Sequence, residues 1–598
     1  MDELDFFYNS NPKKEKTNKD SLLKRLKNRF GIDIFTKNLP HVLTKKERYL
    51  IFLFIILTTA GIIAIPVSSY YHYTKAAPDF GSTYKEGILG EPRFINPVLE
   101  VSDADRDLTA LLYSGLMKND GKGNLIPNLA SHYELSNDGL SYTFFLKKNV
   151  KWHDGKQFTA DDVIFTIFTI QNADFNSTQR INWQGVEAEK VDDHIVRFSL
   201  KNKYAQFIVN TQVGILPQHI WADIKPMNFA RSETNLRPVG TGPYKFVKFK
   251  KDPSGKIIEY NLEAYKNYHG GKAYIQKFIT KSYASEEEIL DAYKHGEVDG
   301  ISFISNRGLK KLQFQSRLTL HQINLPRYFA LFLNPNQSKL LSDKNIRIAL
   351  SYGTDKNAII NDILNGEAIT VDSPMLPEIL KINSNIKKYN FNPEFAKQIL
   401  DNAGWQVGND GIREKQEKDK KGNVTKTEKL ELNLITSNWS ELLEVANLVK
   451  NQWANIGVKL NIQSAMVNEL QQTYIKNRDY QIMLFGEVLT IDPDPFSFWH
   501  SSQKKDPGLN LALYDNKDSD KLLEEARQTL DPDARKQKYD NFQKIVAEDI
   551  PAIFLYSPTY LYPVTKRVQG LDLQLIGVPS DRFSNVNKWY IETKRVKR

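Results

Sequence analysis

A histidine and three aspartates stand close together in the stretch KWHDGKQFTADD, residues 151–162. His153 is followed directly by Asp154, and Asp161 and Asp162 come a few residues later. Imidazole and carboxylate groups at this spacing could bind a metal ion or exchange protons as an acid–base pair. The same residues could instead form a turn between a strand and a helix, because Asp and Gly favour turns and Asp favours helix starts.

The flanking residues favour the turn. Apolar and polar residues alternate over 142–146, as in a half-buried strand. Asp154-Gly155 is a turn signal, and Thr159 with Asp162 resembles a capping box at the start of a helix. The ten histidines are scattered, without an H-E-x-x-H motif or a second cluster of ligands. We therefore predict a strand, a turn and a helix, and no metal site.

Local motifs for catalysis are also missing. The chain has no cysteine, which excludes a cysteine nucleophile, a cysteine-bound metal and a disulfide framework. It has no G-x-S-x-G elbow, and no Gly-Lys pair is followed by the Ser or Thr of a P-loop. We expect neither an enzyme nor a bound cofactor, although a catalytic site built from dispersed residues stays open.

The formal net charge of +10 is unevenly distributed along the 598 residues. Many of the excess lysines and arginines precede residue 50, and the rest of the chain mixes both signs. Neither zinc-finger spacing nor an RNA-binding signature accompanies this charge. We do not expect a nucleic-acid partner.

One segment is apolar enough to cross a membrane. Residues 49–67, YLIFLFIILTTAGIIAIPV, carry no charge and suffice for a hydrocarbon core of about 30 Å. Lys45, Lys46 and Arg48 precede them, which places the N-terminus in the cytoplasm. We predict a basic cytoplasmic tail (1–48), a transmembrane helix (49–67), a linker (68–85) and an extracytoplasmic domain in a single-pass protein of the cell membrane.

A cleaved signal peptide is the competing interpretation. Signal peptides have a short basic start and an apolar core of about 7–15 residues. Here the apolar run is longer and follows nearly fifty mostly polar residues, so we favour an uncleaved anchor. Without a cysteine there is no residue for a lipid anchor.

Helix-like and strand-like runs alternate after the linker, which predicts a mixed α/β protein. Asn392, Pro393 and Gly404 mark the start and end of one helix, and Ser342-Asp343 marks the start of another. Two more helices are expected in 519–530 and 534–549. The charged stretch 413–429, with a Gly-Asn turn signal, predicts a solvated hairpin.

Blocks spread over residues 86–560 carry a family resemblance. They resemble, in order, those of the family 5 extracellular solute-binding proteins, the peptide- and nickel-binding components of ABC importers. The blocks are GEP (90–92) with Asn96-Pro97, LLYSGLMKND (111–120), the long stretch 125–163, RPVGTGPYKF (237–246), GEVDG (296–300), DKNIRIALSYGTDKNAII (343–360), YNFNPEFAKQILDNAGW (389–405) and EDIPAIFLY (548–556).

The resemblance implies a two-lobed, periplasmic-binding-protein-like α/β fold with an extra subdomain, here preceded by the transmembrane helix. The solute-binding domain would span 86–598. Lobe I would comprise about 86–115, 238–328 and 557–598, the inserted subdomain about 116–237, and lobe II about 329–556. The lobes would close on a small solute, with a peptide as the first choice, and the closed form would dock on permease subunits of the importer.

The resemblance also implies where a ligand is held. The stretch FGEVLTIDPDPFSFW corresponds to the family's acidic site for a ligand amine, and Asp492 and Glu487 are the candidates. Asp492 also fits a simple turn, since Asp-Pro-Asp-Pro is a strong turn signal. Trp439 and Trp499 are candidate aromatic contacts, although each could equally belong to the core.

Two questions stay open from the sequence. The family also binds nickel complexes, sugars and other small solutes, so the ligand class is not decided by the resemblance. A membrane-anchored surface hydrolase, an adhesin or a sensor on the same scaffold is the alternative function, because a fold does not dictate its function.

Overall fold

The computed structural model describes residues 43–312, 317–377, 379, 385–419 and 423–598. The predicted tail therefore lies almost wholly outside the described residues. The chain divides into two compact units. The first comprises the residues up to Ala77 together with Thr593–Arg598, and the second comprises Pro78–Glu592.

Helix α3 (Lys45–Tyr73) dominates the first unit. It begins with a capping box between Thr44 and Glu47, has no buried residue, and is long and apolar enough to cross a membrane. The hydroxyls of Thr58 and Thr59 donate to carbonyls four residues earlier, so both are satisfied within the helix. The predicted apolar helix is therefore present and extends into the polar flanks of the predicted 49–67 span.

A two-stranded sheet completes this unit, with β1 (Thr74–Pro78) beside β23 (Thr593–Lys597).

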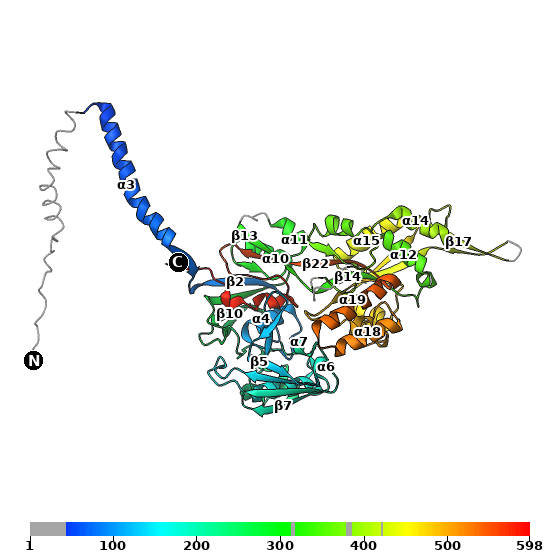
Figure 1. The fold of residues 1–598 in the computed structure, drawn as a ribbon, viewed down its shortest axis with the longest axis horizontal. Helices are drawn as coiled ribbons and strands as arrows, with labels where there is room; N and C mark the ends of the chain where they lie inside the picture. Colours follow the sequence, from blue (N-terminus) through cyan, green and yellow to red (C-terminus); the bar gives the residue numbers. More distant parts are fainter. Residues whose placement is uncertain (1–42, 313–316, 378, 380–384, 420–422) are drawn as a thin grey trace, which may run out of the picture. The chain divides into compact units, whose positions relative to one another are not determined.

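A mixed sheet of twelve strands runs through the second unit. Its strands fall into two groups, which we call the first and second lobes, and Figure 1 shows the long strand β22 (Ala552–Thr565) near the middle. The first lobe contains β2 (Gly81–Leu89), β9 (Tyr244–Lys251), β10 (Ile257–Ala264), β11 (Ile275–Tyr283), β12 (Gly300–Ile301) and β13 (Leu318–Asn324). The second contains β14 (Arg327–Leu333), β15 (Ala368–Thr370), β19 (Glu431–Ser437), β20 (Lys459–Ala465) and β21 (Ile482–Val488).

The first lobe carries a smaller antiparallel sheet of four strands in the order β5-β6-β8-β7. Strand β6 shows the alternation expected from the sequence, with Tyr142, Phe144 and Leu146 buried. Helix α5 packs on this sheet, and α4 packs near the large one. The bounds are α4 (Asp103–Leu112), β5 (Ala130–Leu135), β6 (Ser141–Leu146), α5 (Ala160–Gln171), β7 (Val186–Asp192) and β8 (Ile195–Leu200).

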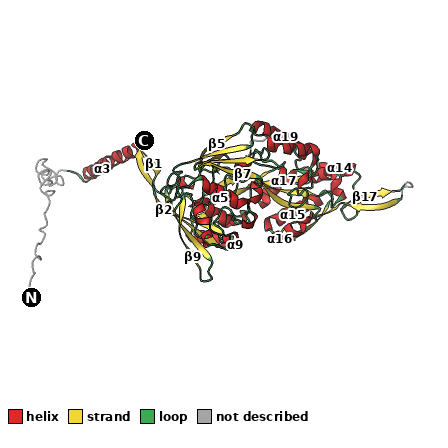
Figure 2. Cartoon of the chain, turned by 90° about the horizontal axis from the view of Figure 1, so that it is seen from below, coloured by secondary structure: helices red, strands yellow, loops and turns green. Residues whose placement is uncertain are grey.

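Helices surround the strands of the second lobe (Figure 2). The helices predicted from caps are present: Asp343 caps α12 and Asn392 caps α14, each accepting a backbone N–H with its side chain. The predicted charged hairpin forms β17 and β18 and projects from this lobe in both views. The bounds are α12 (Lys344–Tyr352), α14 (Pro393–Asn402), β17 (Arg413–Lys418), β18 (Val424–Lys429), α15 (Ser440–Ala454), α18 (Lys517–Gln528) and α19 (Pro532–Asp549).

Strand β22 belongs to both lobes. Its first half pairs with β14, through Ala552 to Tyr556, and its second half pairs with β13, through Thr559 to Thr565. The chain crosses a second time between β13 and β14, directly beside β22. Tyr560 and Tyr562 pack into the core of the first lobe, whereas Phe554 and Tyr556 pack into those of the second. The two crossings therefore lie side by side. The predicted lobe boundaries themselves stay a prediction.

A buried arginine ties distant segments of the first lobe together. Arg582 donates to both carboxylate oxygens of Asp107, each at 2.6 Å, and to Glu86 Oε1 at 3.0 Å. The side chains of Arg582 and Glu86 have no exposed area, and that of Asp107 has 2%. The hydroxyl of Tyr562 on β22 donates to the other Glu86 oxygen. The cluster therefore joins β2, α4, β22 and the C-terminal segment.

We expect Arg582→Met to destabilise the protein by about 3–5 kcal/mol, because two buried carboxylates lose their cation. Urea unfolding of the purified full chain measures this. Arg567→Met is the matched control, since Arg567 is half exposed and pairs with Asp299 at 2.7 Å. The control should cost at most about 1 kcal/mol. Equal losses in the two variants would contradict a structural role for the buried cluster.

Candidate ligand-binding cleft

The His153 stretch forms the predicted turn. His153 Nδ1 accepts the N–H of Gly240 at 3.1 Å, and Nε2 lies 3.1 Å from the carbonyl oxygen of Gly242, to which it donates. Gly155 has a φ of +92°, which an L residue rarely adopts. A glycine therefore suits this position, and both ring nitrogens of His153 are used by the backbone.

The nearby aspartates are also engaged. Asp162 accepts the N–H of Thr159 at 3.0 Å and that of Gln218 at 2.9 Å, at the start of α5. Asp161 pairs with Lys190 at 2.7 Å. Within the described part of the chain, no group of three or more His, Asp and Glu side chains is arranged to hold a metal ion. The predicted strand, turn and capped helix are confirmed.

The protonation of His153 is coupled to folding. Burial lowers its pKa from 6.5 to about 4, because the imidazolium loses its hydration. Between these two pH values the unfolded chain binds more protons at this residue than the folded chain. The folded state therefore loses stability as the pH falls through this window, by at most about 3 kcal/mol.

We expect His153→Gln to reduce the loss of melting temperature between pH 7 and pH 4.5, because the variant lacks the titrating group. Calorimetric melting at both pH values measures the difference, with the same substitution at exposed His132 as control. An unchanged pH dependence would contradict this account. Stoichiometric nickel binding that His153→Gln abolishes would restore the metal interpretation.

A cleft of about 1750 Å³ lies between the two lobes. One wall comes from α4 and the neighbouring residues of the first lobe, and another from the region 179–214 next to the smaller sheet. The opposite wall comes from residues 488–509 and the end of α18 in the second lobe, and 577–581 close one side. Polar and apolar groups both line the cleft, among them Glu100, Tyr113, Lys203, Asp494, Phe496 and Arg527.

Asp494 and Arg527 form an ion pair in the second-lobe wall of the cleft, and first-lobe residues contact this pair. Arg527 Nε lies 2.9 Å from Asp494 Oδ2, and the hydroxyl of Tyr204 from the first lobe donates to the same oxygen at 3.4 Å. The guanidinium lies over the rings of Phe496 and Tyr204, at 4.2 and 5.2 Å from their centroids. The N–H of Ala205 also donates to the Arg527 carbonyl at 2.8 Å. These contacts connect the two lobes in this conformation.

Asp492 lies on the same loop and has a cation of its own. Its two carboxylate oxygens lie 3.0 and 3.2 Å from Arg535 Nη2 on α19. Burial raises the pKa of Asp492 to about 6, and the attraction of Arg535 opposes this shift. The chain bends at Asp492, and the carboxylate there forms an ion pair. A ligand amine would compete with Arg535 for this carboxylate.

Glu487 on β21 is 2% exposed and has no cationic partner among the described residues. The hydroxyl of Tyr328 donates to its Oε2, while Oε1 has no hydrogen-bond partner there. The indole N–H of Trp499 donates to the same Tyr328 hydroxyl at 3.2 Å. Burial raises the pKa of Glu487 to about 8. Glu487 and Trp499 thus belong to one buried network through Tyr328.

Trp439 lies apart from this network. It precedes α15 and is 49% exposed, at the end of β19. None of Asp492, Glu487, Trp439 and Trp499 is among the described residues that line the cleft, although residues 488–491, 494 and 496–498 are. Arg347 donates to backbone carbonyls, including that of Asp549 at 2.9 Å, which satisfies the end of α19.

Sequence reasoning missed several residues that line the cleft. Asp494 belongs to the same Asp-Pro-Asp-Pro repeat as Asp492, so the repeat was a usable signal. Burial raises the pKa of Glu100 to about 7, and this carboxyl group faces the cleft from the first lobe. Tyr204, Arg527 and Glu100 have no local motif, because only the fold brings them together.

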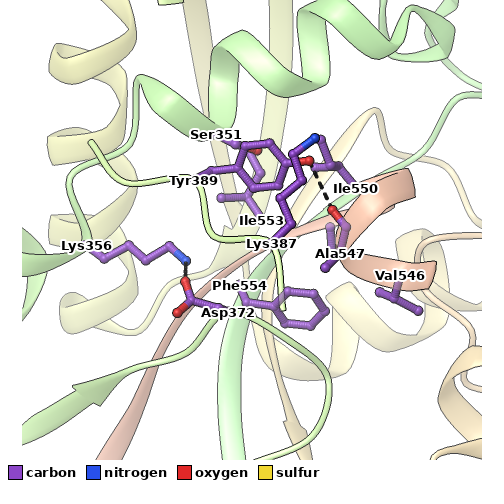
Figure 3. Close-up of a pocket in the computed structure, with 11 residues that line it drawn as sticks. Ser351, Lys356, Asp372, Lys387, Tyr389, Val546, Ala547, Ile550, Ile553 and Phe554 are labelled. Carbon is purple, nitrogen blue, oxygen red and sulfur yellow. Dashed lines mark hydrogen bonds and ion pairs between the residues drawn. The ribbon is translucent and has the colours of Figure 1, made fainter. Parts of the chain in front are cut away.

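A smaller cavity of about 20 Å³ lies elsewhere in the second lobe (Figure 3). Lys356 Nζ lies 2.6 Å from Asp372 at one side, and the Tyr389 hydroxyl donates to the Ala547 carbonyl at 3.1 Å on the other. This volume suits about one water molecule. The cavity is therefore too small for a solute.

Comparison with known proteins identifies the family. The model of the bacterial extracellular solute-binding proteins, family 5 Middle, matches residues 124–510. The chain belongs to this family. It is an extracytoplasmic solute-binding protein of the kind that serves ABC importers, and not an enzyme. The family resemblance of the sequence is confirmed.

Individual relatives match over most of their length. The oligopeptide-binding protein AppA of Bacillus subtilis is 29% identical over 527 residues, which cover 86% of this chain and 92% of AppA. The dipeptide-binding protein of Escherichia coli is 26% identical over 534 residues, which cover 83% and 93%. Both matches therefore cover more than four fifths of this chain.

Solved structures agree with the fold. AppA of Bacillus subtilis in complex with a nonapeptide has a TM-score of 0.67 at 28% identity, covering 86% of this chain and all of that one. NikZ of Campylobacter jejuni in complex with Ni(L-His) has a TM-score of 0.68 at 28% identity, covering 85% and 99%. The predicted α/β fold of the periplasmic-binding-protein type, following one long apolar helix, is therefore confirmed.

Proposed function

We propose that this protein captures a peptide in the cleft between its lobes and delivers it to the permease subunits of an ABC importer. The volume of the cleft is the main support. About 1750 Å³ exceeds the 300–1,000 Å³ of pockets for single small ligands. An extended peptide would fill such a space, and the nonapeptide bound to AppA is an example among the relatives.

Cleft walls that contain both polar and apolar groups suit a peptide of variable sequence. Main-chain hydrogen bonds supply affinity that does not depend on side chains, and wet, roomy pockets accept different side chains. Residues 488–491 continue from the end of β21 along the cleft. Val488 pairs with Arg327 and the Leu489 N–H donates to the Pro326 carbonyl, so an extended ligand would pair with the backbone of Thr490 and Ile491. A small complex such as the one in NikZ would leave most of the cleft filled with water.

The lobes would rotate relative to each other about the two segments where the chain crosses between them. The segments 324–327 and 556–559 lie side by side, so a small rotation there opens the cleft without breaking either core. Because the crossings lie at these two segments, we propose that the lobe boundaries are those expected from the sequence. A ligand that contacts both walls would favour the closed form, because only that form makes both sets of contacts.

A carboxylate near the cleft would bind the ligand amine. Glu487 is the stronger candidate, because it has no cationic partner among the described residues and a ligand ammonium would stabilise its ionised form, but it must become accessible. Asp492 is nearer the loop that lines the cleft, but it would exchange Arg535 for the ligand. Trp439 would contact the ligand from the rim, whereas Trp499 would act from its buried position beside Tyr328.

We expect Glu487→Gln or Asp492→Asn to weaken binding of a peptide with a free amino group by about ten- to a hundredfold. The lost charge-assisted hydrogen bond is worth about 1.5–3 kcal/mol. Titration calorimetry measures the affinities. The same peptide with an acetylated amino group should bind these variants and the unchanged protein alike. Asp572→Asn, at an exposed ion pair with Lys122, is the control.

Negative results in these experiments would contradict different parts of the proposed function. If both variants and the double variant bind the free-amine peptide normally, the proposed amine site is wrong while peptide binding stands. If native mass spectrometry of the purified protein finds another co-purified solute and peptides do not bind, peptide transport is wrong. Release of a cleaved product would point to the hydrolase instead.

We also propose that α3 is a retained membrane anchor with the second unit outside the cytoplasm. The helix has 29 residues, which span about 43 Å and exceed a hydrocarbon core of about 30 Å. Residues 49–67 of the helix carry no charged side chain on any face, as a lipid-facing helix requires. Tethering would keep the binding protein at high local concentration beside its permease.

We expect the intact chain, including its N-terminal residues, to remain with the membrane fraction after an alkaline wash. Leu57→Arg with Ile62→Arg should release it, because each arginine near the middle of the helix costs about 2.5–3.5 kcal/mol. Mass spectrometry of both fractions identifies the N-terminus. If the chain without substitutions appears in the medium and lacks residues 1–67, it has been cleaved, and this result would contradict the anchor.

A further inference from the structure

The C-terminal strand returns to the exit of α3. Strand β23 pairs with β1, and the N–H of Arg598 donates to the carbonyl of Tyr73 at 3.1 Å. Figures 1 and 2 both show the C-terminus beside the end of the helix. The C-terminal strand therefore meets the chain where the helix would leave the hydrocarbon core.

Arg595 holds this junction. Its guanidinium donates to the Thr74 hydroxyl and carbonyl, both at 2.7 Å, and to the Tyr71 carbonyl at 3.2 Å. It also lies over the rings of Tyr71 and Tyr70, at 4.2 and 5.6 Å from their centroids. Both rings are more than half exposed. Exposed tyrosines at the end of an apolar helix are typical of the boundary between membrane and water.

The charge of this junction is of one sign. Residues 74–77 and 593–598 contain five cationic side chains and no acidic one: Lys75, Lys594, Arg595, Lys597 and Arg598. Lys75, Lys597 and Arg598 are exposed. We call this two-stranded segment the cationic collar. The collar has no acidic side chain of its own beside the exposed Lys75, Lys597 and Arg598.

We propose that the cationic collar binds the phosphates of anionic phospholipids on the extracytoplasmic face of the membrane. The inference rests on the proposed anchoring through α3, which would hold the collar at the headgroups. Clustered Lys and Arg beside a membrane helix are attracted to anionic lipid within a Debye length, about 8 Å at physiological salt. Charge complementarity thus favours lipid over a neutral surface.

A spectroscopic test uses the absence of cysteine from the chain. Thr593→Cys places one label at an exposed position at the start of β23. The labelled full chain is placed in nanodiscs of zwitterionic lipid, with and without roughly a third of anionic lipid. Quenching by headgroup spin-labelled lipid then reports how close the collar lies to the surface. We expect severalfold stronger quenching with anionic lipid, which high salt reverses.

Two triple variants sharpen the test. Lys75→Gln, Lys597→Gln and Arg598→Gln together remove exposed charges and leave the Arg595 contacts in place, so the lipid-dependent quenching should disappear. Lys248→Gln, Lys277→Gln and Lys450→Gln remove equal charge from exposed positions elsewhere and should not alter it. Amide exchange in β1 and β23 checks that the collar variant keeps its strand pairing.

The possible outcomes distinguish lipid binding by the collar from the proposed membrane anchor and from the proposed peptide binding. Quenching that ignores lipid charge, or that the collar variant retains, overturns the collar while leaving the anchor intact. A chain that does not enter either nanodisc overturns both. Loss of permease contacts in the collar variant, with quenching independent of lipid charge, assigns the cations to a protein partner and overturns lipid binding. Peptide affinity, measured on the same samples, tests the cleft separately.

Discussion

The backbone hydrogen bonds of β22 are the constraint on which the two-lobed structure depends. This strand completes the sheet of the second lobe with its first half and that of the first lobe with its second half. Neither lobe can satisfy its central backbone groups without it. The lobes are therefore joined by a shared strand and its neighbouring crossing, and the walls of the cleft face each other on either side of this junction.

Buried carboxylates are treated differently in the two lobes. In the first, Arg582 neutralises Glu86 and Asp107 inside the core, and tyrosine hydroxyls complete the hydrogen bonds. In the second, Glu487 is buried beside Tyr328, which donates to it, and has no cationic partner among the residues that the structure describes. A fully paired cluster fixes one arrangement of the segments around it, whereas a carboxylate without a cation retains the capacity to bind one. This contrast makes the second lobe the better place for a charged ligand group.

Long-range contacts also organise the loop after β21. Asp492 and Asp494 pair with arginines on α19 and α18. From the first lobe, the Tyr204 hydroxyl donates to Asp494 and the Gln206 amide donates to the Pro493 carbonyl. A turn that the local sequence already favours is thus held by contacts over more than thirty residues. Asp492 is turned toward Arg535 in the second lobe, whereas Asp494 stays at the cleft with Arg527 and Tyr204.

The sequence alone determined the features that depend on neighbouring residues. The apolar run at 49–67 required a long exposed helix, the alternation at 142–146 required a strand with one buried face, and the caps at Asp343, Thr159 and Asn392 marked helix starts correctly. These follow from hydrogen bonds and burial within one element. The ordered family blocks also identified the fold class, although the lobe boundaries and ligand residues stay predictions.

Tertiary structure decided the features in which distant residues must meet. The pairing of Arg582 with Glu86 joins residues nearly five hundred positions apart, and that of Arg595 with Thr74 more than five hundred. The cleft likewise combines Glu100, Tyr204, Asp494 and Arg527 from separate elements. A carboxylate or an arginine looks the same in the sequence whether it is solvated, paired in a core or facing a ligand. Its partner and its burial, which set its charge state and its role, exist only once the chain has folded.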